Sequence, residues 1–208
     1  MLYDYLKKNY APKDPIFVSD LRKSGIPMNT VRQQVMRLAE DGKLKRFDTG
    51  IYYLPAPSLF KSGASPSLMD VIDRKYHRDG KDCCGYMTGV AFANWIGITT
   101  QVPVAYEIAT NKAKTGYKKT KLGRMNIILR QPRAAVSAEN AKVLQLLDLL
   151  KEIDLLAEIR PEECSQKILA YMRQTGLSFT DLQPYLLLYP DKIFRNLYET
   201  RLLYGVPA

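Results

Sequence analysis

The sequence contains little cysteine, and its placement does not suit disulfide bonds. There are three Cys in 208 residues, and two of them, Cys83 and Cys84, are neighbours. An odd count with an adjacent pair is a poor disulfide framework. We therefore expect a protein of a reducing compartment and interpret the chain as cytoplasmic.

Long apolar runs are missing as well. No run approaches the roughly 18 apolar residues that a membrane helix needs. The first ten residues, MLYDYLKKNY, have the pattern of an amphipathic helix and lack the apolar centre of a signal peptide. The basic residues do not lie beside a strongly hydrophobic helical face. We therefore expect no membrane partner.

Motifs for catalysis and cofactor binding are also lacking. The sequence has no P-loop, no GxGxxG and no HExxH. His77 is the only His, and Asp79 and Cys83 nearby raise the alternative of a metal site or a nucleophile–base pair. Their spacing matches no metal-binding pattern, and adjacent cysteines rarely share a tetrahedral ion. We expect a protein that is not an enzyme and has no cofactor or metal, with His77 in a basic surface turn.

Acidic residues are scarce in the first two thirds of the chain. The formal net charge is +10 and the pI is about 9.4. Residues 1–54 hold ten Lys or Arg against six Asp or Glu, and residues 55–135 hold thirteen against five, whereas residues 136–208 hold eight against ten. This distribution favours a polyanionic partner such as nucleic acid.

The first quarter of the chain has the pattern of a small DNA-binding domain. Its predicted elements are a helix at 1–10, a strand at 16–18, a helix at 20–24 with Ser19 as N-cap, a helix that Asn29 or Thr30 caps and that reaches Asp41, and strands at 44–47 and 51–54 around Asp48-Thr49-Gly50. The order helix, strand, helix, helix, hairpin is that of a winged helix-turn-helix. We predict this fold for residues 1–55.

The third predicted helix carries side chains suited to reading bases. Val31, Val35 and Leu38 fall together on a helical wheel and face the core. Asn, Gln and Arg make bidentate contacts with base edges in the major groove. The predicted DNA contacts are Asn29, Thr30, Arg32, Gln33 and Arg37 on this helix, Lys43, Lys45 and Arg46 at the hairpin, and Ser19 with the first amides of the second helix. The alternative is a solvated helix face, or a winged helix that contacts protein.

The remainder is predicted to be a second, mixed domain. Residues 56–67 are rich in Pro and Ser and are interpreted as a linker, followed by a domain at 68–208. Helices are expected at 68–76, 85–97, 165–174, 179–188 and 191–203 and from residue 137 onward, with strands at 102–110 and 124–129. Phe92, Trp95 and Tyr86 are expected core anchors, as are the leucines at 144–150. The fold class is therefore α+β, with a winged helix followed by a mixed α/β domain with a helical C-terminus.

Two features of this second domain leave alternatives open. A predicted basic loop, residues 111–121, contains Lys112, Lys114, Lys118, Lys119 and Lys121 around Tyr117. It either follows a phosphate backbone or is a solvated loop that serves solubility. Glu107 lies in the middle of an apolar strand that Gln101 and Asn111 bracket. Either these polar residues merely end the strand, or a buried Glu107 is paired with Arg124 or Lys112.

Two segments resemble a known protein family over nearly the whole chain. They are VRQQVMRLAEDGKLKRFDTGIYYLP at 31–55 and the more specific GYMTGVAFANWIGITTQVPVAYEIATN at 85–111, and PDKIFRNLYETRL at 190–202 is consistent with them. These segments resemble the AbiEi-type antitoxins of bacterial type IV toxin–antitoxin systems. The resemblance implies an N-terminal winged helix that represses its own operon by binding promoter inverted repeats. It also implies a C-terminal antitoxin domain that neutralises a nucleotidyltransferase-like toxin and adds positive surface for DNA.

The partners expected from the resemblance are thus double-stranded operator DNA and a cognate toxin. An orphan regulator without a toxin, and a protein-interaction module, are the alternatives. The sequence carries no short motif that places the toxin-facing residues.

Overall fold

The helix at the start of the chain buries the apolar face that its sequence predicts. In the computed structural model, which describes residues 1–56 and 65–202, α1 (Leu2–Asn9) places Leu2 and Leu6 fully inside the protein. These side chains are four residues apart and therefore lie on one face of the helix. The chain forms two units, Met1–Lys75 and Tyr76–Ala208.

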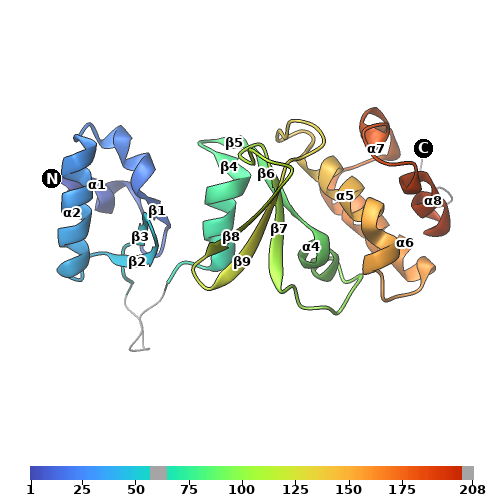
Figure 1. Cartoon of the computed structure of the whole chain (residues 1–208), viewed down its shortest axis with the longest axis horizontal. Coiled ribbons are helices and arrows are strands. Elements are labelled where there is room, and N and C mark those ends of the chain that lie inside the picture. Colours follow the sequence, from blue (N-terminus) through green and yellow to red (C-terminus); the bar gives the residue numbers. More distant parts are fainter. Residues whose placement is uncertain (57–64, 203–208) are drawn as a thin grey trace. The chain divides into compact units, whose positions relative to one another are not determined.

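The elements of the first unit follow the order expected from the sequence. They are α1, β1 (Ile16–Phe17), the 3₁₀-helix η1 (Val18–Ser24), α2 (Met28–Glu40), β2 (Lys45–Asp48) and β3 (Ile51–Tyr53). The strands form an antiparallel sheet in the order β1-β3-β2 (Figure 1). The core of this unit consists of Leu2, Leu6, Ile16, Leu21, Val31, Val35, Leu44 and Leu54.

Two helix starts differ from the prediction. η1 begins at Val18, so Ser19 lies inside its first turn and makes no capping hydrogen bond there. α2 begins at Met28, directly after Pro27, so Asn29 and Thr30 belong to its first turn instead of capping it. A proline at this point loses nothing by lacking an N–H, because the first amides of a helix have no partner within it.

The first unit also includes a helix from beyond the predicted linker. α3 (Leu68–Ile72) begins with a capping box: Ser67 Oγ accepts a 3.0 Å hydrogen bond from the Asp70 N–H, and Asp70 accepts one of 3.2 Å from the Ser67 N–H. The helix continues as a π-helical turn, η2 (Asp73–His77). Most of the predicted linker, residues 57–64, lies outside the described residues.

The second unit is built on a four-stranded sheet. Its elements are β4 (Arg78–Asp79), β5 (Asp82–Cys83), β6 (Gly85–Thr88), α4 (Gly89–Trp95), β7 (Ala105–Thr110), β8 (Tyr117–Leu122), β9 (Met125–Arg130), α5 (Ala141–Leu156), α6 (Pro161–Thr175), α7 (Phe179–Leu186) and α8 (Lys192–Glu199). β4 and β5 form a small hairpin. The main sheet has the order β6-β7-β9-β8, in which β7 and β9 are parallel and the other neighbours antiparallel.

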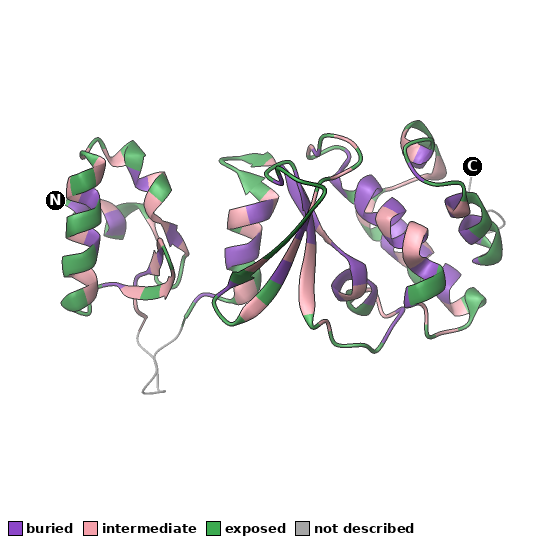
Figure 2. Ribbon diagram, viewed as in Figure 1, coloured by how far each residue is buried: buried purple, intermediate pink, exposed green. Residues whose placement is uncertain are grey.

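The helices of this unit gather on one side of the sheet (Figure 1). α5 is central, since it contacts α4, α7, α8 and β6. Its leucines at 144, 146, 147, 149 and 150 are all fully buried, as predicted. Figure 2 shows buried segments along this helix. The predicted α+β class and the helical end of the chain are confirmed. In the described part of the chain, no helix is both long and apolar enough to span a membrane.

Two predicted elements are wrong because strand pairing overrides the local pattern. Residues 85–88, expected as helix, form β6 and pair with β7, and the helix starts only at Gly89. Half of the expected lysine loop is strand β8, which pairs along its full length with β9. β8 lies at an edge of the sheet, where lysines discourage pairing with other chains.

One predicted core anchor is also wrong. Phe92 and Tyr86 are buried, but the Trp95 side chain is 63% exposed. Trp95 is the last residue of α4 and stacks on Phe92, with 6.0 Å between the ring centroids, so it covers the core from outside.

Candidate nucleic-acid interface

One face of α2 is a continuous exposed stripe. Its members are Asn29, Arg32, Gln33, Met36, Arg37 and Glu40. The steps of three and four residues place them on a single side of the helix, opposite the buried Val31 and Val35. Four of the five residues predicted to read DNA are therefore together on this stripe, and the half-buried Thr30 lies beside it.

The two halves of the stripe have different character. The first half carries Asn29, Arg32 and Gln33, where the Asn29 side-chain oxygen lies 3.5 Å from Arg32 Nη1. The second half contains Met36, which is 59% exposed and was not among the predicted DNA contacts. Arg37 also lines a groove of about 370 Å³ beside α1, together with Met1, Tyr3, Asp4, Gln34, Leu38 and Lys43. Three of the four exposed side chains of α2 that the sequence predicted to contact DNA, Asn29, Arg32 and Gln33, thus lie in its N-terminal half.

Arg46 lies on β2 opposite Tyr52, and its guanidinium reaches the turn of the β2–β3 hairpin. Arg46 Nη2 donates a 3.0 Å hydrogen bond to the Thr49 hydroxyl, and Nε donates to the Asp48 carbonyl at 3.4 Å. Gly50, with φ of 71°, adopts the left-handed conformation that the turn requires, as the sequence predicted. The turn thus holds the guanidinium in place while it stays accessible to a phosphate.

The other residues of the first unit that were predicted to contact DNA are less well placed to bind a phosphate. Lys45 is half-buried on the strand opposite Tyr53. Lys43 pairs with Asp41 at 3.2 Å. Ser19 is exposed, but its hydroxyl lies 3.4 Å from the Asp20 carboxylate, which repels a phosphate. Asp20 in turn pairs with Arg74 at 3.1 Å, and this offsets part of its charge.

The five lysines of residues 112–121 do not form one surface. Alternation along β8 places Lys119 and Lys121 with Tyr117 on one face and Lys118 on the other. The Lys119 ammonium lies 6.0 Å from the centre of the Tyr117 ring. Lys114 lies in the preceding loop, and Lys112 donates from Nζ to the Arg78 carbonyl. Tyr117, Lys119 and Lys121 are therefore the coherent basic group on this strand, and we call them the β8 basic face.

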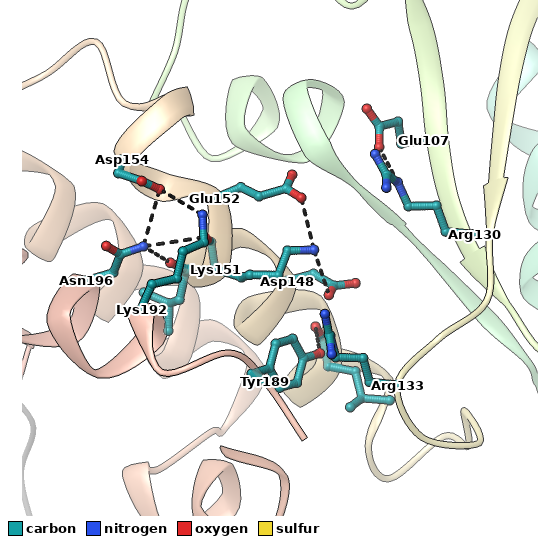
Figure 3. A network of polar contacts seen from close by, with 12 residues as sticks. Glu107, Arg130, Arg133, Asp148, Lys151, Glu152, Asp154, Tyr189, Lys192 and Asn196 are labelled. Atoms are coloured by element: carbon teal, nitrogen blue, oxygen red, sulfur yellow. Dashed lines mark hydrogen bonds and ion pairs between the residues drawn. The ribbon is translucent and has the colours of Figure 1, made fainter. Parts of the chain in front are cut away.

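A polar cleft lies between the sheet and α5 in the second unit (Figure 3). It has a volume of about 310 Å³ and is lined by Thr88, Glu107, Gly116, Arg130, Gln131, Pro132, Arg133, Asp148, Lys151 and Glu152. Six of these residues are ionisable, three acidic and three basic. The sequence singled out only Glu107 among them, because its mid-strand position was unusual.

Glu107 is paired with a residue that the sequence did not predict. Its carboxylate accepts a 2.6 Å hydrogen bond from Arg130 Nε, so Glu107 is paired, as one of the two alternatives had it, but with neither Arg124 nor Lys112, the partners that this alternative named. The reason is the parallel pairing of β7 with β9, which sets Arg130 opposite Ala109 and on the same sheet face as Glu107.

The α5 side of the cleft is organised around Asp148. The Tyr86 hydroxyl donates to Asp148 at 2.9 Å, and Lys151 Nζ lies 3.8 Å from Asp148 and 2.9 Å from Glu152. Burial raises the pKa of the Asp148 carboxyl, and the Lys151 charge and the Tyr86 hydrogen bond partly oppose this rise. Burial and the nearby Asp148 carboxyl raise the pKa of Tyr86 as well, so its hydroxyl remains a donor.

The alternative site around His77 gains no support from geometry. Cys83, Cys84 and Cys164 are free thiols. Within residues 1–56 and 65–202, no group of three His, Cys, Asp or Glu side chains is placed to hold a metal ion.

Comparison with known proteins identifies a family but not an activity. Residues 6–176 match the family described as "Family of unknown function (DUF6088)". The match includes α2, the β2–β3 hairpin, the whole four-stranded sheet and every residue that lines the cleft. A search of curated proteins finds no match.

Proposed function

We propose that this chain, which belongs to the DUF6088 family of unknown function, is a sequence-specific DNA-binding regulator. The observation that carries the proposal is the exposed stripe of α2, with Asn29, Arg32 and Gln33 in its first two turns. These are the side chains that make bidentate contacts with adenine and guanine. A helix presented on a small, well-packed unit fits the major groove.

In this proposal residues 1–55 form a winged helix-turn-helix. α2 is the recognition helix, η1 is the helix before it, and the β2–β3 hairpin is the wing. Arg46 then contacts a phosphate or the minor groove from strand β2 of the wing. The net charge of +10 supports a polyanionic partner.

The finer role that we propose is that of an autorepressing antitoxin. It rests on the resemblance of residues 31–55 and 85–111 to the AbiEi-type antitoxins. In this role the first unit binds the operator and the second unit neutralises a nucleotidyltransferase-like toxin.

The deciding experiment is a binding titration of the full chain with DNA. Fluorescence anisotropy would compare the roughly 100 bp upstream of its own gene with a scrambled duplex of equal length, at two salt concentrations. We expect a preference of at least ~10³-fold for the upstream duplex. A protein that makes eight phosphate contacts would show a log–log salt slope of roughly −7.

Equal and weak binding to both duplexes would overturn the DNA proposal and favour the protein-interaction alternative. The antitoxin role has its own test. Expression of the gene next to this one should arrest growth, and co-expression of this chain should restore it. Growth arrest that co-expression does not relieve would leave an orphan regulator.

A further inference from the structure

The polar cleft between the sheet and α5 contains charged side chains that are largely shielded from water and are not part of the apolar core. Side chains of Asp148 and Lys151 are only 12% and 16% exposed, and that of Glu107 is 20% exposed. Removing such charges from water costs free energy that their pairing seldom repays in full. The neighbouring core of Phe92, Leu146, Leu147 and Leu150 is fully apolar and complete without them. A polar network of this kind at a cleft is a candidate ligand site.

The two arginines of the cleft are held in fixed orientations. Arg130 donates from Nε to Glu107, and its guanidinium lies 5.5 Å from the centre of the Tyr117 ring. Arg133 donates from Nη1 to the Leu188 carbonyl at 2.8 Å and lies 5.0 Å from the centre of the Tyr189 ring. A guanidinium has five N–H donors. Each arginine is thus oriented by one hydrogen bond and one aromatic ring. The other N–H groups of its planar guanidinium can donate to a phosphate.

Both the sheet side and the α5 side of the cleft also supply acceptors. Glu152 and Asp148 project from α5, and Glu107 faces them from β7 (Figure 3). Carboxylates accept hydrogen bonds from hydroxyl and amino groups. The three acids and three bases cancel in formal charge. A single phosphate can use the N–H groups of the arginines that the described contacts leave over, whereas a chain of phosphates would extend over more of the three carboxylates.

From this arrangement we propose that the cleft binds a nucleoside monophosphate, a function that does not depend on DNA binding. Arg130 and Arg133 hold the phosphate of the nucleotide. The sugar hydroxyls or the amino group of the base donate hydrogen bonds to the carboxylates of the cleft. A volume of about 310 Å³ is at the lower end of the range for small-molecule sites.

The test is isothermal titration calorimetry of the full chain without DNA. The probes are the four ribonucleoside 5′-monophosphates, the four nucleosides and inorganic phosphate. We expect at least one monophosphate to bind about tenfold or more tightly than both its nucleoside and inorganic phosphate. If no monophosphate binds at about 5 mM, or if inorganic phosphate binds as tightly as every nucleotide, the proposal is wrong.

Three variants locate the binding. Arg133→Ala and Arg130→Lys should each weaken the monophosphate by about tenfold or more, since the first removes a guanidinium and the second removes the planar fork. Arg173→Ala, which removes an exposed arginine from α6, should leave the affinity unchanged. Arg133 is exposed, and its described contacts include no ion pair with an acid, so we expect Arg133→Ala to fold. If Arg130→Lys fails to fold, the affinity of Arg133→Ala alone decides the proposal. Unchanged affinity in Arg133→Ala would overturn the proposal.

Discussion

A Cβ atom added to Gly89 would lie 3.0 Å from Cδ of Glu107 and 3.2 Å from its Oε1. Gly89 also has a φ of 65°, in the left-handed region where side chains are strained. Two separate constraints therefore act at this residue. It joins β6 to α4, and it leaves the space in which Glu107 meets Arg130.

Gly89→Ala should accordingly destabilise the protein. We expect the free energy of unfolding to fall by about 1–3 kcal/mol, from backbone strain and from displacement of the Glu107 carboxylate. Urea unfolding followed by circular dichroism measures this change. Gly116→Ala is the matched control, because its added Cβ would meet no atom within 4 Å and its φ is not in the left-handed region. An equal loss in both variants would contradict the explanation.

Asp148 should make stability depend on pH in an unusual direction. Its pKa is higher in the folded protein than the ordinary 3.8, because burial disfavours the charged form. The folded state therefore holds the proton of Asp148 more tightly than the unfolded state does. The resulting stabilisation is complete below about pH 3.8 and is lost as the pH rises through the pKa of Asp148 in the folded protein. The free energy of unfolding of Asp148→Asn minus that of the parent protein should therefore be more positive near pH 7 than near pH 4. A constant difference across this range would show that folding does not raise the pKa of Asp148.

Asp181 provides a control of opposite sign. The Ser178 backbone N–H and hydroxyl donate to its carboxylate and lower its pKa. The contribution of Asp181 to stability is therefore present at pH values above its ordinary pKa. It is lost as the pH falls through its lower pKa in the folded protein. Asp181→Asn should be less stable than the parent near neutral pH, and the difference should shrink in acid. Unfolding midpoints measured at several pH values report both variants.

Gln33 should contribute to base selectivity in the proposed complex with DNA. Gln33→Ala should lose about 1–3 kcal/mol with the preferred duplex and relax the preference at one base position. Anisotropy titrations against duplexes with each base changed in turn measure this effect. Lys8→Ala removes an exposed charge from α1 and should alter affinity little. A uniform loss over all duplexes in Gln33→Ala would assign the residue to the phosphate backbone instead.

The β8 basic face should contribute affinity without selectivity. Changing both Lys119 and Lys121 to Ala should weaken all duplexes alike and reduce the magnitude of the log–log salt slope by roughly 2. Lys118→Ala, on the other face of the same strand, should leave the slope unchanged. If Lys118→Ala flattens the slope as well, the lysines act as a diffuse charge. If neither variant has an effect, this strand does not contact DNA.

The amino-acid sequence by itself determined the parts of the fold that depend on local periodicity. The spacing of Leu2 and Leu6, and of Val31 and Val35, predicted which helix faces are buried, and the leucines of α5 had too many apolar neighbours to remain in water. Gly50 marked the hairpin turn, because few other residues adopt a positive φ there. The exposed stripe of α2 follows from the same periodicity, since the face opposite a buried one must be in solvent.

Only the tertiary structure decided which distant segments meet. β6 and β8 are strands because β7 and β9 offer them hydrogen-bonding partners, a reason that lies outside their own residues. Trp95 is exposed because α4 ends at the surface. Glu107 meets Arg130 through a parallel pairing between strands that are separated along the chain by β8. The cleft combines residues from three strands, two loops and α5, so its chemistry exists only once the sheet and the helix have packed together.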